Sequence, residues 1–286
     1  MSKIGLVLEG GAMRGIYTAG VLDVFMEKGL RFDGVIGVSA GAIHGCSFVS
    51  GQHGRSLRYI KKYRGDYRFM SVRSFLRTGN VVDPEFCYKE IPERLDVFDN
   101  EAFMQSPTQF YVTCADLETG HAHHQHITDM NAQIDYLRAS ASLPYFSKIV
   151  EIDGRKYLDG GCADSIPVMA FREMGYTHNV LVLTHPADHV RHQEHRGFTE
   201  IIYKDYPRFV SSLQNHYKRY NATLRRIEEL EKSKEVFVIR PAKKLKIGRM
   251  ERDLKTVQKV YDIGRADALA CMEELIQWMQ NETQSL

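Results

Sequence analysis

Hydrophobic residues follow two patterns along the chain. Short, largely apolar runs cover residues 4–8, 35–38 and 179–183, and such runs are typical of strands buried on both faces of a parallel sheet. Between them apolar residues recur every three or four positions, as in residues 16–25, which indicates helices. The alternation of the two patterns predicts an α/β fold with a mostly parallel central sheet.

Two segments in the middle of the chain predict hairpins. Residues 148–152 and 156–158 flank Asp153-Gly154, a dipeptide typical of tight turns. Residues 109–114 alternate like a strand, and the run after them, residues 121–126, holds four histidines. On a strand these side chains would point to opposite faces, so they could not converge on one ion without a bulge. We therefore expect a polar hairpin strand and no metal site.

The last third of the chain has a different character. Residues 200–231 form a long amphipathic pattern interrupted at Pro207, residues 236–240 predict a further strand, and residues 257–279 predict helices. We therefore expect two parts, a domain over residues 1–185 and a mostly helical region over residues 186–286 that packs on it. The tyrosine-rich, basic segment 200–231 also has a second interpretation, contact with a membrane surface.

Composition narrows the class of protein. The chain has 286 residues, 43% of them hydrophobic and 26% charged, which are globular values, and its net charge of +2 gives no reason to expect a nucleic acid partner. No apolar run is long enough to span a bilayer, and the first nine residues lack the apolar core of a signal peptide. The five scattered cysteines suit reduced thiols. We expect a cytoplasmic protein, free or peripheral to a membrane.

The first candidate for chemistry is the serine in Gly37-Val-Ser39-Ala-Gly41, which follows the apolar run 35–38. This Gly-x-Ser-x-Gly pattern is typical of a tight turn from strand to helix that exposes the serine oxygen above the sheet. Ser39 is therefore a candidate nucleophile, although the same five residues also suit an ordinary turn. A serine hydroxyl needs a base and oxyanion donors to react.

The second candidate is the glycine-rich turn of residues 10–15, Gly-Gly-Ala-Met-Arg-Gly, which lies between the first apolar run and a helical pattern. Its unpaired backbone N–H groups would suit an anion. Dinucleotide binding fits less well, because Asp33 precedes the second strand and does not close it. A Walker phosphate loop lacks its Lys-Ser/Thr pair. An oxyanion hole beside the serine turn is the favoured interpretation.

The third candidate is Asp159, at the end of the predicted hairpin and followed by Gly160 and Gly161. A carboxylate at a strand end, with glycines that let the chain bend toward another loop, suits a catalytic base, although Asp-Gly-Gly alone is also a common turn.

With these three motifs in this order, the chain resembles the patatin-like phospholipase family, in particular its bacterial stand-alone members. The resemblance covers residues 4–183 and includes the small-residue turn of residues 139–146 before the hairpin. It implies a three-layer α/β/α fold that hydrolyses acyl esters of lipids with a Ser–Asp dyad, without a catalytic histidine and without a cofactor.

The resemblance also implies a role for each motif residue. Ser39 would be the nucleophile and Asp159 the base. The oxyanion hole would come from the N–H groups of Gly10, Gly11, Ala12 and Met13. Arg14 matches the basic residue of the family's loop, and the remaining motif positions are glycines that shape the turns, Gly15, Gly37, Gly41, Gly160 and Gly161. Ala12 departs from the family, which usually has a third glycine there; if that position needs a positive φ, alanine would strain the turn by about 1 kcal/mol or more.

Two other hypotheses compete with the dyad. A histidine triad would use His185, which follows the strand predicted at residues 179–183. A non-catalytic module would bind an anionic ligand or a lipid at the glycine-rich turn, with help from the basic C-terminal third. If the chain is a hydrolase, the substrate could be a phospholipid, a neutral lipid, a lysolipid or a thioester, since the motifs do not distinguish these.

Overall fold

A mixed β-sheet forms the centre of the molecule. The computed structural model describes residues 3–193 and 197–284. Within these residues the sheet has eight strands in the order β5-β6-β3-β2-β1-β7-β8, with β4 also paired to β3. The strands are β1 (Ile4–Leu8), β2 (Gly34–Val38), β3 (Gln109–Asp116), β4 (Ala122–Ile127), β5 (Val150–Ile152), β6 (Arg155–Asp159), β7 (His178–Val182) and β8 (Val236–Ile239).

Strand directions confirm the predicted, mostly parallel sheet. β1, β2, β3, β7 and β8 run parallel to one another. The antiparallel pairs are the two hairpins and the pairing of β6 with β3. The histidine-rich run forms β4, with His126 stacked on Tyr111 and His123 packed near Tyr157.

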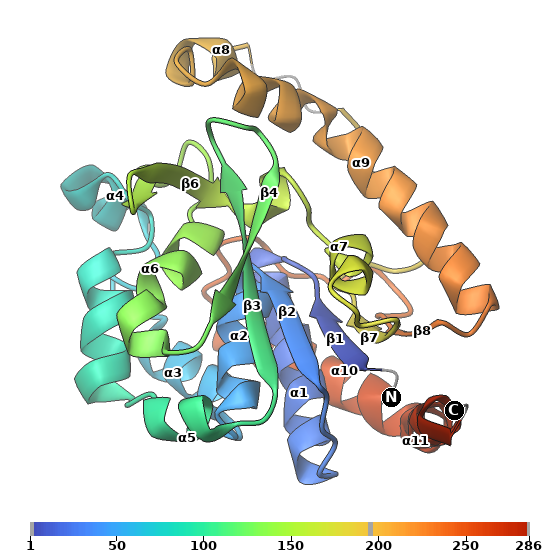
Figure 1. Ribbon diagram of the computed structural model, residues 1–286. Coiled ribbons are helices and arrows are strands. Elements are labelled where there is room, and N and C mark those ends of the chain that lie inside the picture. The colour runs from blue at the N-terminus through green and yellow to red at the C-terminus, as the bar shows by residue number, and fades with distance from the viewer. Residues whose placement is uncertain (1–2, 194–196, 285–286) are drawn as a thin grey trace.

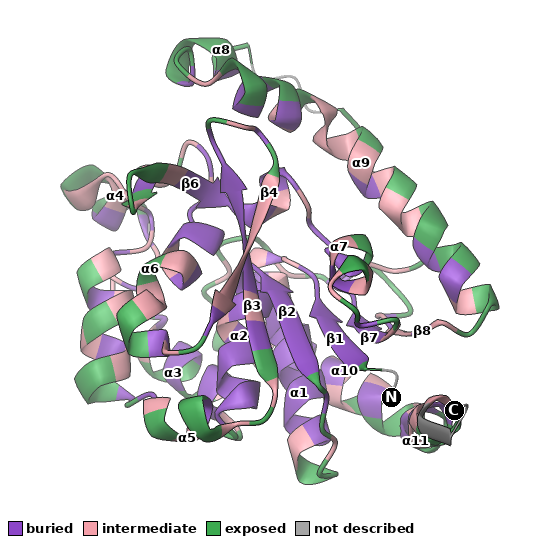
Figure 2. Cartoon of the chain, viewed as in Figure 1, coloured by how far each residue is buried: buried purple, intermediate pink, exposed green. Residues whose placement is uncertain are grey.

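Helices cover both faces of the sheet, as the three-layer prediction requires (Figure 1). Leu6 and Leu8 of β1 belong to a core with helices of one face, and Val7, between them, belongs to a second core with helices of the other. The first face carries α1 (Ile16–Glu27), α2 (Ala40–Val49), α3 (Arg55–Tyr63), α6 (Met130–Ser140), α10 (Leu254–Ala270) and α11 (Met272–Gln284); the second carries α7 (Val168–Glu173) and α9 (Pro207–Lys232). Figure 2 shows β1 and β2 buried between these layers.

The C-terminal third packs on both faces and at the edge of the sheet. β8 extends the sheet beside β7, α9 joins the second core and α10 lies along α1. The α1–α10 contact is close because a Cβ on Gly20 would lie 2.2 Å from the Tyr261 carbonyl oxygen, and one on Gly264 would lie 2.1 Å from that of Tyr17. The division of the chain at residue 185 stays a prediction.

The segment of residues 74–99 is more helical than its sequence pattern indicates. It contains most of α4 (Val72–Thr78) and a π-helix, η2 (Phe86–Leu95), and leads to α5 (Asn100–Gln105). The buried apolar residues Phe86 and Ile91 are five positions apart, the same separation as the i to i+5 hydrogen bonds of a π-helix. A search for apolar spacings of three and four does not detect that separation. The remaining short helices are η1 (Ala12–Gly15), η3 (Gly160–Cys162) and α8 (Thr199–Ile202).

Among residues 3–193 and 197–284, no helix combines the length and the apolar character that crossing a bilayer requires.

Candidate active site

Ser39 occupies a sharp turn between β2 and α2. Its backbone has φ 53° and ψ −121°, a strained conformation for a residue with a side chain. The flanking glycines make the turn possible, because a Cβ on Gly37 would lie 2.6 Å from the Ala42 nitrogen and one on Gly41 would lie 2.4 Å from the Leu8 carbonyl oxygen. The turn therefore has the geometry of a nucleophile elbow.

A neighbouring serine holds the elbow in place. The Ser39 N–H donates to Ser140 Oγ over 2.8 Å, and the Ser140 hydroxyl donates to the Thr113 carbonyl over 2.6 Å. Ser140 ends α6 and is fully buried. The sequence pattern indicated a small-residue turn over residues 139–146 but no role for Ser140. The alternating Ala-Ser-Ala-Ser of residues 139–142 was the available signal.

Sheet order explains how Asp159 reaches Ser39. β2 pairs with β3 as far as Val38 and Thr113, and β6 pairs with the next residues of β3, beginning with Asp159 opposite Cys114. β4 occupies the other edge of β3 over residues 110–115. β6 therefore continues the place of β2 in the sheet, and the residues at the facing ends of these two strands meet.

The two side chains form a short hydrogen bond. The Ser39 hydroxyl donates to Asp159 Oδ2 over 2.7 Å, and the Gly161 N–H donates to Oδ1 over 2.8 Å. Gly160 allows this close approach, because a Cβ there would lie 2.1 Å from the Thr113 carbonyl oxygen. Asp159 thus has one oxygen anchored by the backbone and the other directed at the hydroxyl.

Burial changes the pKa of the Asp159 carboxylate. Asp159 is 4% exposed and Ser39 is 7% exposed. Burial raises the pKa of Asp159 to about 6, against the opposing effect of the two hydrogen bonds and of the positive charges on Arg191 and Arg249. A carboxylate with a pKa near 6 is ionised at neutral pH and is more basic than an ordinary aspartate.

The glycine-rich turn lies against the elbow. A Cβ on Gly10 would lie 3.3 Å from Ser39 Cβ. Gly11, Ala12 and Met13 stand at the start of η1, where N–H groups have no acceptor within the helix. The Gly10 N–H was expected to be an oxyanion donor, but in the structure it donates to the Ser165 carbonyl over 3.4 Å. Ala12 has φ 47°, so the position does require the conformation in which glycine is favoured.

A buried glutamate beneath this turn was not identified from the sequence. Glu9 is fully buried; one carboxylate oxygen accepts hydrogen bonds from the N–H and hydroxyl of Thr184, and the other accepts one from the Tyr220 hydroxyl over 2.7 Å. The negative charge of Glu9 also acts on Arg14. An acidic residue that ends a buried apolar strand directly before glycines was the signal available in the sequence.

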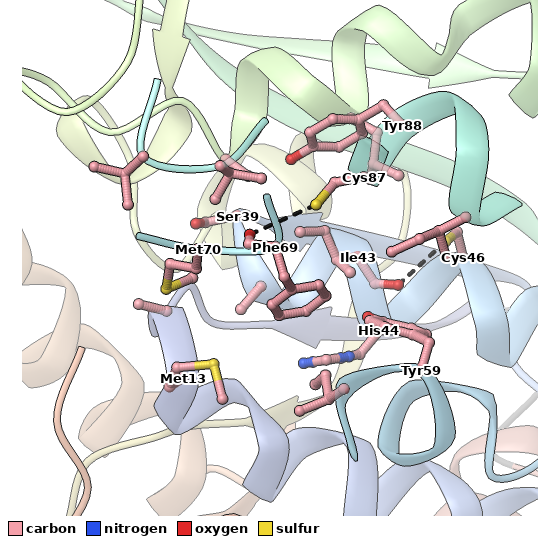
Figure 3. Close-up of a pocket in the computed structure, with 18 of the residues that line it drawn as sticks. Met13, Ser39, Ile43, His44, Cys46, Tyr59, Phe69, Met70, Cys87 and Tyr88 are labelled. Carbon is pink, nitrogen blue, oxygen red and sulfur yellow. Dashed lines mark hydrogen bonds between the residues drawn. The ribbon is translucent and has the colours of Figure 1, made fainter. Parts of the chain in front are cut away.

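Ser39 lines two cavities that differ in character. One, of about 270 Å³, is apolar and lies among α2, α3, η2 and α6. Figure 3 shows Ile43, Phe69, Met70 and Tyr88 around it. The other, of about 740 Å³, has a mixed lining that includes several charged side chains and runs from the glycine-rich turn toward α9; we call it the polar cavity. Arg14 and Gly161 line only the polar cavity, whereas Met13 lines only the apolar one.

No histidine among the described residues forms a triad with Ser39. In the described parts of the chain the Ser39 hydroxyl bonds to Asp159, and no hydrogen bond joins it to a histidine. His185 stacks on His189, His44 Nδ1 lies 3.0 Å from the Ser56 hydroxyl, and His178 pairs with Glu282. Nor do residues 3–193 and 197–284 hold a cluster of three or more potential metal ligands.

Comparison with known proteins identifies the family. A model described as "Patatin-like phospholipase" matches residues 6–172, and one described as "Domain of unknown function (DUF6363)" matches residues 206–280. "Uncharacterized protein YjjU" of Escherichia coli (strain K12) is 28% identical, over 92% of this chain and 75% of its own. "Neuropathy target esterase sws" of Drosophila melanogaster and "Lysophospholipase NTE1" of Saccharomyces cerevisiae are 24% and 27% identical over 84% and 60% of this chain, which spans 18% and 10% of their lengths.

Among solved structures, VipD from Legionella pneumophila matches 96% of this chain and 67% of its own with a TM-score of 0.47 and 12% identity. The phospholipase model covers more than half of the chain, including the segments that contain Ser39 and Asp159. The chain therefore belongs to the patatin-like phospholipase family, a family of lipid hydrolases.

Proposed function

We propose that the chain hydrolyses carboxylic esters of lipids through an acyl-serine intermediate, with Ser39 as nucleophile and Asp159 as general base. The observation that carries the proposal is the 2.7 Å hydrogen bond between the Ser39 hydroxyl and a buried carboxylate whose second oxygen is held by the Gly161 N–H. A positioned base of raised pKa is what an otherwise weak serine nucleophile requires.

In the first step Asp159 accepts the hydroxyl proton while Ser39 Oγ attacks the ester carbonyl carbon. The N–H groups of Gly11, Ala12 and Met13 would stabilise the oxyanion, and Asp159 would return the proton to the departing alcohol. In the second step water attacks the acyl-serine carbonyl carbon and gives a proton to Asp159, which passes it to Ser39 Oγ as the bond between that oxygen and the carbonyl carbon breaks, so that the carboxylic acid and free Ser39 are released.

The apolar cavity supports an acyl chain as the part of the substrate next to the scissile bond. Its walls are largely hydrophobic, with Ile43, Phe69 and Met70 among them, and Ser39 lies on its surface. Burying the methylenes of a chain there would contribute binding energy at about 0.8 kcal/mol each. The same cavity offers little to a small polar ester.

The site also supports peripheral contact with a bilayer. Phe146 lines both cavities and is half exposed. On one side its carbonyl accepts the Val81 N–H, shortly after α4, where Leu76 is 81% exposed. On the other side the Tyr145 ring packs on Phe198 beside α8, where Ile201 is 74% exposed. Exposed apolar side chains on either side of Phe146 would insert into the surface of a bilayer. The protein would then extract a lipid from the leaflet that it contacts.

Labelling by a fluorophosphonate probe tests the mechanism. We expect the wild-type protein to be labelled and to hydrolyse nitrophenyl esters, and Ser39→Ala to lose both, with a fall in kcat of at least about a thousandfold. Ser47→Ala is the matched control, because Ser47 is a buried serine on the same helix whose hydroxyl accepts a hydrogen bond from Arg55. Equal labelling of wild type and Ser39→Ala would refute the assignment. Absence of labelling in a folded wild type would favour the non-catalytic lipid-binding hypothesis.

A further inference from the structure

The polar cavity beside Ser39 collects positive charge. Its charged lining comes from segments far apart in the sequence, the glycine-rich turn, the loop after β7 and the loop after β8. Among the lining residues that the structure describes, the cations are Arg14, Arg191, Lys244 and Arg249, and the carboxylates are Asp159 and Glu200. The apolar cavity shares only Arg249 with this set.

Helix α9 holds one of these cations in place. The Arg191 backbone N–H donates to Asn221 Oδ1 over 2.9 Å, and the Asn221 side-chain amide donates to the Arg191 backbone carbonyl over 2.8 Å. The guanidinium lies 4.1 Å from the centroid of the Tyr220 ring and donates to the His216 ring over 3.0 Å. Arg191 is therefore fixed toward the cavity by contacts that leave its charge in place.

The cations act on one another and on the neighbouring imidazoles. Burial lowers the pKa of Arg14; the negative charge of Glu9 opposes this effect, whereas the charges of Arg191 and Arg249 add to it. Burial lowers the pKa of His216 to about 3 and that of His185 to about 2, with Arg191 adding to both effects. These imidazoles are neutral at pH 7 mainly because they are buried, and the nearby cations add to that effect. Among the described residues, Arg14 Nε is buried and has no hydrogen-bond partner.

We propose that this cavity binds the phosphate of an anionic lipid head group while the acyl chain occupies the apolar cavity, so that lipids of net negative charge are preferred to zwitterionic ones. Ser39 lines both cavities, which places the ester between the head group and the chain. Arginine and lysine are the residues that proteins use to bind phosphate, and they would repel the quaternary ammonium group of a choline lipid. This inference rests on the proposed function and specifies its substrate.

Binding to the Ser39→Ala variant tests the head-group site without turnover. Calorimetry with dihexanoyl phosphatidic acid and dihexanoyl phosphatidylcholine, both kept below the concentration at which they form micelles, compares two lipids with the same chains. We expect the phosphatidic acid to bind at least about tenfold more tightly. In the Ser39→Ala background, a second substitution, Arg191→Gln or Lys244→Gln, should weaken the binding of phosphatidic acid by about tenfold, as for a lost charge-assisted hydrogen bond. Lys244→Arg keeps the charge and should bind phosphatidic acid as tightly as the Ser39→Ala variant alone.

Lys243→Gln is the matched control. Lys243 precedes Lys244 in the same exposed loop but does not line the cavity, and its substitution removes the same charge. Equal affinity for the two lipids, or equal losses in Lys243→Gln and Lys244→Gln, would overturn the inference. Binding of glycerol 3-phosphate as tight as that of the lipid would overturn it too, in favour of a site for soluble phosphate.

Hydrolysis by the wild-type protein separates this inference from the proposed function. Selective binding of phosphatidic acid without hydrolysis of any ester would reject the esterase and retain the head-group site. Hydrolysis of both lipids at equal kcat/KM, with equal affinities in Ser39→Ala, would retain the esterase and reject the head-group site.

Discussion

Replacing Asp159 by asparagine should abolish activity and stabilise the fold. The asparagine has nearly the same shape, its carbonyl can accept the Gly161 N–H, and its amide can donate to the Ser39 hydroxyl, so both hydrogen bonds of the carboxylate have substitutes. What the variant loses is a negative charge in a site that is 4% exposed. Proteins often carry such destabilising charges where function requires them.

The pKa of Asp159 gives the size of the effect. It is raised from 3.8 to about 6, and one pKa unit corresponds to about 1.4 kcal/mol, so holding the carboxylate ionised in the folded state costs about 3 kcal/mol at neutral pH. The folded protein binds this proton more tightly than the unfolded chain. The stabilisation from the protonated form is therefore complete below about pH 4 and is lost as the pH rises through about 6.

Urea unfolding of both proteins between pH 4 and pH 8 measures this difference. We expect Asp159→Asn to exceed the wild type by about 3 kcal/mol at pH 8, with the gap closing toward pH 4. Ser39→Ala is the control, because it is also expected to be inactive but keeps the carboxylate and removes a hydrogen bond that lowers its pKa. It should be no more stable than the wild type at pH 8. An Asp159→Asn variant that is less stable than the wild type at pH 8, or a gap that does not change with pH, would refute the reasoning.

Four further predictions follow from the same geometry. Because Asp159 must be ionised to act as a base, kcat/KM for a soluble ester should fall as the pH drops through about 6, and a rate that stays constant down to pH 4 would exclude it as the base. Ala12→Gly should raise the free energy of unfolding by about 1 kcal/mol, since Ala12 has φ 47°, and an unchanged denaturation midpoint would contradict that strain. Ser140→Ala should lower it by about 2 kcal/mol, since the Ser39 N–H and the Thr113 carbonyl both lose a buried partner; a neutral effect would show that another group replaces the hydroxyl. Ile43→Phe should reduce the size of the apolar cavity and shift kcat/KM in a nitrophenyl ester series toward shorter chains, whereas an unchanged profile would place the acyl chain elsewhere.

Features that depend on short stretches of sequence could be predicted. The alternation of apolar runs and helical patterns predicted the parallel strands, and Asp153-Gly154 predicted the turn between β5 and β6. Both follow from local rules, because a buried strand must be apolar on both faces and a tight hairpin turn needs residues that accept positive φ. Asp153 and Gly154 have φ 50° and 74°.

Features that depend on how distant segments pack could not be predicted in detail. The sequence pattern placed Ser39 and Asp159 each at the end of a strand. Whether these two strand ends face each other depends on which edge of β3 pairs with β6, and that choice is not visible in the sequence. Only the known arrangement of the family supplied that information beforehand. The same limit applies to Ser140, whose brace on Ser39 joins residues 101 positions apart.

The C-terminal third shows why a region without motifs can still shape the site. Tyr220 is one of two tyrosines on the amphipathic helix α9, and nothing in its neighbourhood in the sequence distinguishes it. In the fold its hydroxyl donates to the buried Glu9, directly before the glycine-rich turn, and its ring packs under the Arg191 guanidinium. The Tyr220 side chain thus contacts both Glu9, directly before the glycine-rich turn, and Arg191, a cation of the polar cavity. Because these partners lie 211 and 29 positions away in the chain, only the packing of α9 on the sheet gives the residue a function.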